Sequence, residues 1–591
     1  MIMKKVMKTM MLLALIVGLQ GCSQEDESWM DDWYGNIEEG TTAVGGESGG
    51  ATASSGDLTT FTVVIDRSSA EPQTTVGEYF PDEEDDLANN TFATQVNISF
   101  DGNKATFDEV SGVTITANGA HVVADHGSTA GIHYVVTGTT TNGSLTVMGE
   151  KKYEIELKGT DITNPDSTAL NLLSKKRAFL QLANGTTNVL ADGSSSKASD
   201  QKGALYCKGK LLMSGEGQLE VYGNYNNGIH VADYIVLRSG INVYVKSTAN
   251  HGIKANDGVY VNGGIINVEV TAAAAKGINC ESNIIVNGGR TTVITTGSGT
   301  WDSDDQEVKG AAAIKCDSTY TQNGGEVYLK STGNGGKGLK ADYEAYVNGG
   351  SLYVITEGSK YTSNNDTASP KGIKIGTKNV HGALDVNGGL LMVRTKGANG
   401  EGIESKGTLN VSGGNVQVSA YDDAVNSAGD MTISGGDIVT VSTGNDGMDA
   451  NGNMYVKGGN IVAFGASGAE SGIDVGEQCR LYITGGNVFG IGGRIDASLG
   501  STTQGVVSTS GSVSANAAVT VSDGSSTLVT FNMPPYSYNN GTIMLTATGM
   551  ASAGSYKLSM GSTSQDVTAS ASLSSGMGAG MQPGGGGRHG W

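Results

Sequence analysis

A glycine pair recurs through the middle of the chain at intervals too regular for an ordinary globular domain. Its first glycine stands at positions 263, 288, 324, 349, 388, 413, 435, 458 and 485. Each pair precedes a short alternating segment such as Val327-Tyr328-Leu329, and no unit contains a helical pattern. Alternation with period two indicates β-strands, and self-similarity at about 20 to 50 residues indicates stacked repeats. The spacing therefore predicts an all-β solenoid.

A second landmark, Gly-apolar-X-small, lies between the glycine pairs, for example at Gly252-Ile253-Lys254-Ala255. One such unit cannot bury its own apolar face, whereas stacked units bury a continuous core. We therefore predict a right-handed parallel β-helix whose coils rise about 4.8 Å each. The Leu and Asn spacing of leucine-rich repeats is absent, and a propeller needs about 40 residues per blade.

Composition and repeat boundaries predict six segments. Because the ends of a solenoid need caps, we assign a cap to each side of the repeats, and we expect the acidic run at 81–86 in the first cap to be solvated. The segments are a signal peptide (1–21), a flexible tether (22–56), an N-terminal β cap (57–130), the β-helix (131–494), a C-terminal β cap (495–575) and a disordered Gly-rich tail (576–591).

The first residues predict the compartment. Three lysines precede ten apolar residues at 10–19, a stretch too short to span a bilayer. Leu19-Gln20-Gly21-Cys22 then resembles the lipobox of bacterial lipoproteins, and Glu25-Asp26-Glu27 resembles a surface-export signal. We predict lipidation of Cys22 and a surface-exposed lipoprotein of the outer membrane; the alternative is an ordinary signal peptide with a chance cysteine.

The net charge of the chain restricts the partners it can bind, and the positions of its cysteines indicate their role. The chain carries 37 Lys and Arg against 59 Asp and Glu, a net charge of −22, without basic clusters. Such a chain is a poor nucleic-acid binder, and we expect a monomer.

Cys207, Cys280 and Cys316 fall in the inward small-residue column, so we predict free thiols that fill the core.

One corner of the repeat carries a column of asparagines. An in-register column of amides can bond along the stack, and the adjacent glycines suit positive-φ corners. We interpret these asparagines as structural: Asn262, Asn287, Asn323, Asn348 and Asn387.

The outward positions of the Gly-apolar-X-small motif change sign along the chain. The middle coils carry lysines, which could pair with uronate carboxylates; the alternative is a solubility face crossed by salt bridges. The last coils carry carboxylates, which suit Ca²⁺; the alternative is a solvated face. The candidate ligand-binding lysines are Lys276, Lys337, Lys340, Lys371 and Lys374. The candidate calcium ligands are Glu401, Glu404, Asp422, Asp423, Asp446, Asp449 and Asp474.

Aromatic residues offer a second way to bind sugars, because exposed rings can stack on sugar faces. Two long intervals between glycine pairs mark insertions on the same side of the coil, one with Trp301 and one with Tyr361. Tyr328 and Tyr353 share an outward column in neighbouring coils. The alternatives are neutral surface drift for the insertions and ordinary β-surface tyrosines.

Several segments carry a resemblance to a known family, among them Asn142-Gly143-Ser144-Leu145 and Glu401-Gly402-Ile403-Glu404-Ser405-Lys406, with the runs at 155–164 and 181–188. Over roughly residues 95–575 the sequence resembles the carbohydrate-binding β-helix family typified by a clostridial protein that binds cellulose and pectin-like acidic sugars. The resemblance implies a polysaccharide-lyase-like fold used for binding, with calcium on the helix.

Three functions follow as hypotheses. The first is a surface lipoprotein that binds acidic or cellulosic polysaccharide without catalysis. The second is a calcium-dependent polysaccharide lyase, which needs a base for the proton α to the carboxyl group and a cation for the enolate; Arg394 would lie two coils from Glu404 and Asp423. The third is an adhesin or structural stalk.

Overall fold

The computed structural model describes residues 51–53, 61–67, 70–72, 76–197 and 201–573. Contacts divide the chain into two units, Met1–Gly49 and Gly50–Trp591, and every described residue belongs to the second. This unit is all-β, with 56% strand and parallel sheets, which is compatible with the predicted β-helix. The predicted signal peptide, Cys22, most of the tether and the tail lie outside the described residues.

The helices of the described residues are single 3₁₀ turns, η2 (Glu83–Asp85) and η3 (Leu87–Asn89). Over the same part of the chain, no helix has the length and apolar character needed to cross a membrane.

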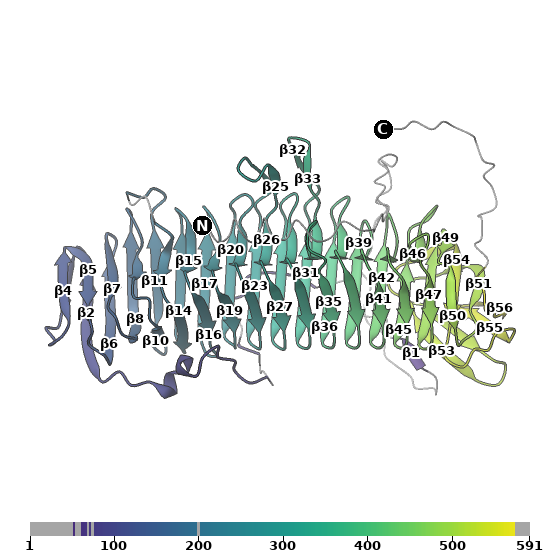
Figure 1. The fold of residues 1–591 in the computed structure, drawn as a ribbon, viewed down its shortest axis with the longest axis horizontal. Helices are drawn as coiled ribbons and strands as arrows, with labels where there is room; N and C mark the ends of the chain where they lie inside the picture. The colour runs from purple at the N-terminus through teal and green to yellow at the C-terminus, as the bar shows by residue number, and fades with distance from the viewer. Residues whose placement is uncertain (1–50, 54–60, 68–69, 73–75, 198–200, 574–591) are drawn as a thin grey trace, which may run out of the picture. The chain divides into compact units, whose positions relative to one another are not determined.

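Each repeat contributes three short strands, which we assign in chain order to faces 1, 2 and 3. Strands β15 (Asn227–Val231), β16 (Tyr234–Leu237) and β17 (Asn242–Ser247) pair in parallel with β18 (Ile253–Ala255), β19 (Gly258–Val261) and β20 (Ile265–Val270) of the next repeat. The same pairing continues through the successive repeats, whose strands stand side by side in Figure 1.

The strands of face 1 form one sixteen-stranded sheet. Besides β15 and β18 it contains β4 (Thr114–Asn118), β5 (Ala120–Asp125), β7 (Gly143–Met148), β9 (Leu170–Leu172), β12 (Gly203–Cys207), β21 (Lys276–Cys280), β26 (Ala312–Cys316), β29 (Lys337–Ala341), β34 (Lys371–Ile375), β37 (Glu401–Ser405), β40 (Val425–Ser427), β43 (Met448–Ala450), β46 (Ser471–Val475) and β49 (Arg494–Asp496).

Faces 2 and 3 are built in the same way. Face 2 also contains β10 (Ala178–Leu182), β13 (Leu211–Gly215), β22 (Asn283–Val286), β27 (Thr319–Gln322), β30 (Glu344–Val347), β35 (Ala383–Val386), β38 (Thr408–Val411), β41 (Met431–Ile433), β44 (Met454–Val456), β47 (Leu481–Ile483) and β50 (Leu499–Thr502). Face 3 also contains β11 (Thr187–Asp192), β14 (Gln218–Gly223), β23 (Arg290–Thr295), β28 (Glu326–Ser331), β31 (Ser351–Thr356), β36 (Leu390–Thr395), β39 (Asn415–Ala420), β42 (Asp437–Ser442), β45 (Asn460–Phe464) and β48 (Asn487–Gly492).

The inward residues of the three faces form one continuous core. In β18, Ile253 and Ala255 are buried while Lys254 between them is partly exposed, as the alternation predicts. The core also holds Cys207, Cys280 and Cys316 as free thiols, which confirms the prediction for these three cysteines.

The asparagine column is a hydrogen-bonded ladder, as predicted. Asn287 donates to Asn262, Asn323 to Asn287 and Asn348 to Asn323, at 2.8 to 2.9 Å. The second glycine of each neighbouring pair has φ between 73° and 85°, where a residue with a Cβ is strained. Together, the ladder and these corners keep successive repeats in register.

Antiparallel strands close the repeats at both ends. At the start, β3 (Lys104–Phe107) pairs antiparallel with β2 (Thr94–Asp101), and β4 with β5. Parallel pairing already links β2 to β6 (Ile132–Thr140), which in turn pairs with the long strand β8 (Tyr153–Asn164). The repeats therefore begin before residue 131, and β3 and β4 cover the open edge.

At the other end, β49 and β50 still pair in parallel with the preceding repeat, so the repeats extend beyond residue 494. The antiparallel strands follow as β51 (Val507–Val513), β52 (Ala518–Ser522), β53 (Thr527–Asn532), β54 (Tyr538–Thr546), β55 (Ser555–Met560) and β56 (Thr563–Thr568), with β1 (Ala51–Ala53) beside β53.

The described residues of 61–92, which we call the strap, form no β-strand and lie against faces 2 and 3. The Arg67 guanidinium stands 4.5 Å from the centre of the Tyr244 ring. The Glu71 carboxylate accepts hydrogen bonds from the backbone N–H of Gly240 and Gly264 at 2.8 and 2.6 Å. A segment expected to cap one end therefore contacts the sides of several repeats.

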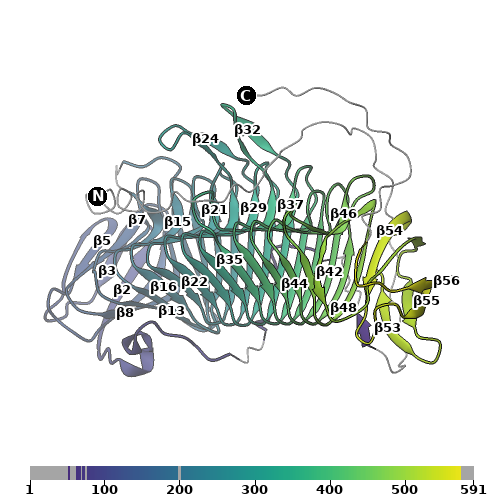
Figure 2. The same ribbon diagram turned by 45° about the vertical axis from the view of Figure 1, so that its right-hand side comes forward.

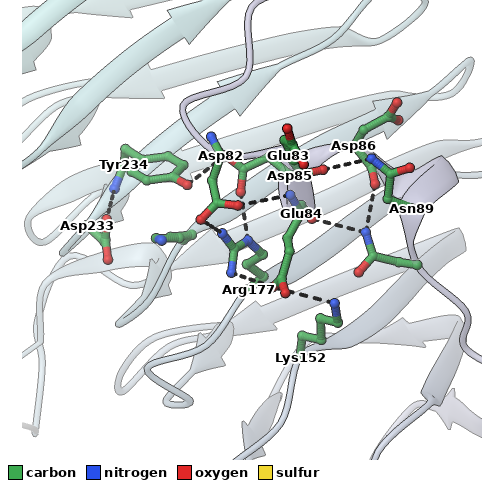
Figure 3. A network of polar contacts seen from close by, with 12 residues as sticks. Asp82, Glu83, Glu84, Asp85, Asp86, Asn89, Lys152, Arg177, Asp233 and Tyr234 are labelled. Carbon is green, nitrogen blue, oxygen red and sulfur yellow. Dashed lines mark hydrogen bonds and ion pairs between the residues drawn. The ribbon is translucent and has the colours of Figure 1, made fainter.

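Asp82, Glu83 and Glu84 of the acidic run are exposed, as predicted, whereas Asp85 is buried against Arg177, the residue directly before β10 of face 2 (Figure 3). Asp85 is fully buried, accepts from Arg177 Nε at 2.7 Å and from the Tyr234 hydroxyl at 2.6 Å. Asp82 and Glu84 bind the same guanidinium at 2.5 and 3.0 Å.

Candidate functional site

The pairing of face 1 aligns the charged residues in two columns. The first runs Lys276, Ala312, Lys337, Lys371 and Glu401 in successive strands. The second, three residues further along each strand, runs Asn279, Lys315, Lys340, Lys374, Glu404, Asn426, Asp449 and Asp474. Face 1 is therefore basic in the middle and acidic towards the C-terminal repeats, as the sequence predicts.

Several of these side chains are buried although they point away from the core. Lys371 is 8% exposed, Glu404 and Asp423 are 5% exposed, and Asp446 is 7% exposed. This burial disfavours the alternative of a solvated acidic face for Glu404, Asp423 and Asp446, whereas Lys371 fits the alternative of a lysine face crossed by salt bridges.

Two hairpins project beside strands β21 and β29 of face 1 (Figure 2). Strands β24 (Thr300–Asp302) and β25 (Glu307–Lys309) form the first, and β32 (Tyr361–Ser363) and β33 (Asp366–Ala368) form the second. The backbone N–H of Val308 donates to Asp366 Oδ2 at 2.6 Å, which joins the hairpins. The two insertions lie on the same side of the coil, as predicted, and they carry Trp301 and Tyr361.

Carboxylates already neutralise most of the candidate lysines. Lys371 Nζ lies 2.7 Å from Glu401 and 3.1 Å from Glu404. Lys374 Nζ lies 3.0 Å from Glu404, and Lys340 Nζ lies 3.0 Å from Asp342. The neighbouring lysines hold the pKa of Glu404 below its usual range despite burial. An anionic ligand would have to compete for Lys340, Lys371 and Lys374, and a metal ion would have to compete for Glu401 and Glu404.

Lys276 and Lys337 differ from the other candidate lysines. Lys276 donates to the backbone carbonyls of Ala274 and, at 3.0 Å, Gly310, and Lys337 donates to that of Gly335 at 2.9 Å. Among the described residues, no carboxylate lies within 4.0 Å of either ammonium group. Burial first, and then neighbouring lysines, lower the pKa of each to about 7.

The backbone of Gly310 forms the surface beneath both lysines, the lysine floor: Lys276 Nζ donates to its carbonyl, and Lys337 Nζ lies beside it. A Cβ at this position would lie 2.2 Å from the Gly335 carbonyl oxygen and 2.9 Å from Lys337 Nζ, closer than real Cβ contacts. Sequence reasoning did not single out Gly310; its signal is a glycine at the end of the insertion, two residues before β26 of face 1.

Hydrogen bonds from backbone N–H groups and from the Asn426 side chain link the carboxylates of neighbouring acidic repeats. Asp423 Oδ1 accepts from the backbone N–H of Asp446 at 3.1 Å, and Asp446 Oδ1 accepts from that of Ser471 at 2.5 Å. Asn426 Nδ2 donates to Asp423 and Asp449 at 3.0 and 3.2 Å. Burial raises the pKa of Asp446 and Asp449 to about 8.

In the described part of the chain, no group of three or more His, Cys, Asp or Glu side chains is arranged to hold a metal ion. Calcium binding by this stripe, including Asp422 and Asp474, therefore stays a prediction that requires these side chains to rearrange.

The predicted tyrosine pair lies on another face. Tyr328 and Tyr353 stack with centroids 4.7 Å apart in face 3, and Phe61 of the strap lies 5.3 Å from the Tyr353 ring. Arg394 also belongs to face 3, so it does not share a face with Glu404 as the lyase hypothesis requires. Trp301 and Tyr361 are the candidate aromatics that lie near the lysines.

Comparisons with known proteins place these features in context. A carbohydrate-binding domain-containing protein of Acetivibrio thermocellus is 30% identical over 157 residues, which are 25% of this chain and 52% of the relative. The chain thus matches about half the length of that curated relative. A solved structure of a polysaccharide lyase-like protein from C. thermocellum, a gadolinium derivative, is 17% identical and covers 66% of this chain and 99% of that one. Its TM-score is 0.25, which supports no conclusion about this protein.

A family model gives the wider match. The model of carbohydrate-binding domain-containing proteins matches residues 109–273, 245–393 and 380–533, which together make up well over half of the chain and contain both charged columns of face 1. This protein belongs to the family of carbohydrate-binding domain-containing proteins.

Proposed function

We propose that the protein binds an acidic polysaccharide along face 1, without catalysis, and that Lys276 and Lys337 receive its carboxylates. The observation that carries this proposal is two partly buried ammonium groups whose partners among the described residues are backbone carbonyls alone. A partly buried charge without a counter-charge is costly. A ligand carboxylate would supply the missing counter-charge through a charge-assisted hydrogen bond.

The arrangement of the repeats favours a linear polymer as the ligand. On a right-handed parallel β-helix, the fold that we propose, strands of face 1 follow one another at about 4.8 Å. Lys276 and Lys337 lie two strands apart, with the small Ala312 between them. A chain laid along the stack meets both lysines, while Trp301 and Tyr361 of the hairpins offer rings for stacking.

The strap supports face 1 as the ligand face. Strap residues contact Tyr244 and Tyr353 on face 3 and Arg177 and Tyr234 on face 2. The uncovered tyrosines of faces 2 and 3 are therefore fewer than the sequence suggests, whereas the lysines of face 1 carry no strap contact among the described residues.

A calcium-dependent lyase is the second candidate, and one observation favours it. An amine with a pKa near 7 is partly neutral at neutral pH and could take the proton α to a uronate carboxyl group. Lys276 and Lys337 meet that requirement. Release of unsaturated uronides, followed by ultraviolet absorbance, would replace the binding-only proposal; an adhesin or stalk would show neither product nor sugar binding.

The proposed setting is the cell surface. A lipid on Cys22 would anchor the protein to the outer membrane as a monomer, which fits the lipobox-like Leu19-Gln20-Gly21-Cys22. Incorporation of labelled palmitate into wild type but not into Cys22→Ala tests the anchor.

Calorimetric titration with oligogalacturonate and with cello-oligosaccharides tests the proposed function. The double variant Lys276→Met with Lys337→Met should bind oligogalacturonate at least tenfold more weakly than wild type. Lys246→Met is the matched control, because Lys246 lies on face 3 and is 3.6 Å from Glu269, and it should bind as wild type. Equal losses in both variants, or no binding of wild type, would contradict the proposal.

A further inference from the structure

A polar pocket lies on face 1, several repeats N-terminal to the lysines. Its volume is about 360 Å³, and its floor carries His121 of β5, Ser144 and Thr146 of β7 and Asn171 of β9. The loop at 164–168 and Lys197 form the rest of its lining. None of the site residues predicted from the sequence lies in it.

The lining offers hydrogen bonds without a net charge. Asp166 and Lys197 are 2.6 Å apart and neutralise each other at the rim. His121 Nδ1 and Ser144 Oγ are 3.1 Å apart on the floor. Such a set of imidazole, hydroxyl and amide groups suits the hydroxyls of an uncharged ligand.

Two side chains of the floor have unused hydrogen-bonding capacity. Thr146 and Asn171 are adjacent in the strand pairing and partly exposed. Within the described part of the chain neither side chain has a hydrogen-bond partner, whereas the buried Asn164 nearby donates to Thr168 O at 2.8 Å and accepts from Asp166 N at 3.2 Å. The loop is thus held internally, while the floor keeps free donors and acceptors.

The pocket and the lysines share one row of face 1. From Thr146 the pairing passes through Asn171, Tyr206, His230 and Lys254 to Asn279 of β21, the strand that begins at Lys276. Five strand spacings separate β7 from β21, about 24 Å. A linear polymer along face 1 would therefore reach both.

We propose that this pocket binds an uncharged sugar unit of the same polysaccharide, through hydrogen bonds from its hydroxyls to Thr146 and Asn171. The inference rests on the proposed function and narrows its ligand: the preferred polymer carries uncharged sugars as well as uronates. A ligand of sufficient length engages both sites at once, so its affinity exceeds that for either site alone.

Calorimetric titration with cellohexaose, trigalacturonate and a rhamnogalacturonan oligosaccharide that contains both sugar types tests the inference. Thr146→Val with Asn171→Ala removes the free hydroxyl and carboxamide groups, and Val keeps the shape of Thr. Relative to wild type, this variant should bind cellohexaose at least tenfold more weakly and trigalacturonate equally well. The mixed oligosaccharide should bind wild type more tightly than the other two and lose affinity in this variant and in Lys276→Met with Lys337→Met.

Thr432→Val is the matched control, because Thr432 is an outward residue of face 2, and it should change none of the three affinities. If trigalacturonate binds wild type while cellohexaose does not, or if cellohexaose binding survives Thr146→Val with Asn171→Ala, the pocket inference is wrong and the proposed function stands. If no saccharide binds wild type, both fail.

Discussion

Lys276 donates from Nζ to the backbone carbonyl of Gly310, 34 positions further along the chain, at 3.0 Å. The contact ties β21, which begins at Lys276, to the segment just before β26, the strand that lies between β21 and β29. Gly310→Ala should disturb this arrangement, because its Cβ would lie 2.2 Å from the Gly335 carbonyl oxygen. Overpacking of this kind costs roughly 1 to 3 kcal/mol. We expect a lower melting temperature and weaker binding of oligogalacturonate.

Gly77→Ala is the control for that prediction, because no atom lies within 4 Å of a Cβ at position 77. Wild-type binding by Gly310→Ala would show that the lysines do not depend on this floor.

The lysine pair should make stability and binding respond to pH in opposite directions. Between about pH 7 and the ordinary lysine value of 10.5, the unfolded chain binds more protons at Lys276 and Lys337 than the folded chain. Their contribution to stability therefore rises with pH. Oligogalacturonate binding should weaken over the same range as the two amines lose their charge.

Thermal melting of wild type and of Lys276→Met with Lys337→Met from pH 6 to pH 10 isolates this contribution from other titrating groups. The stabilisation of the variant relative to wild type should be largest below pH 7 and should shrink as the pH rises. A difference that does not change with pH would contradict the prediction.

Asp85 should hold the strap in place. It is fully buried and accepts from Arg177 and Tyr234, and breaking a buried ion pair by removing one partner costs about 3 to 5 kcal/mol. Asp85→Ala should lower the melting temperature and expose the strap to limited proteolysis. Glu84→Gln should change little, because Glu84 binds the same Arg177 with a side chain that is 57% exposed.

Calcium is expected to raise the melting temperature at millimolar concentration, because it would compensate the acidic repeats and bind only the folded state. The variant should be Asp423→Asn with Asp446→Asn. Alanine would leave the backbone N–H groups of Asp446 and Ser471 without their acceptors. We expect no calcium shift in the variant; if neither calcium nor magnesium shifts the wild type, the stripe is no metal site.

Local periodicity made much of the fold predictable. Glycine pairs, the asparagine ladder and the outward columns all recur once per repeat, so alignment of the repeats already gives the neighbours across strands. The structure places Lys340, Lys374 and Glu404 side by side in successive strands, in the expected order. The insertions with Trp301 and Tyr361 also lie on the same side of the coil, as predicted.

The sequence by itself determined the β repeat, its register and the change of charge along face 1, because these depend on residues one repeat apart. Only the tertiary structure decided which lysines lack a carboxylate partner among the described residues, since Asp342, Glu401 and Glu404 pair with Lys340, Lys371 and Lys374 and not with Lys276 or Lys337. It also decided where the strap lies: Asp85 accepts a hydrogen bond from the hydroxyl of Tyr234, 149 positions further along the chain. Such contacts carry no periodic signal, because they depend on side-chain directions and on segments that meet only after the repeats have stacked.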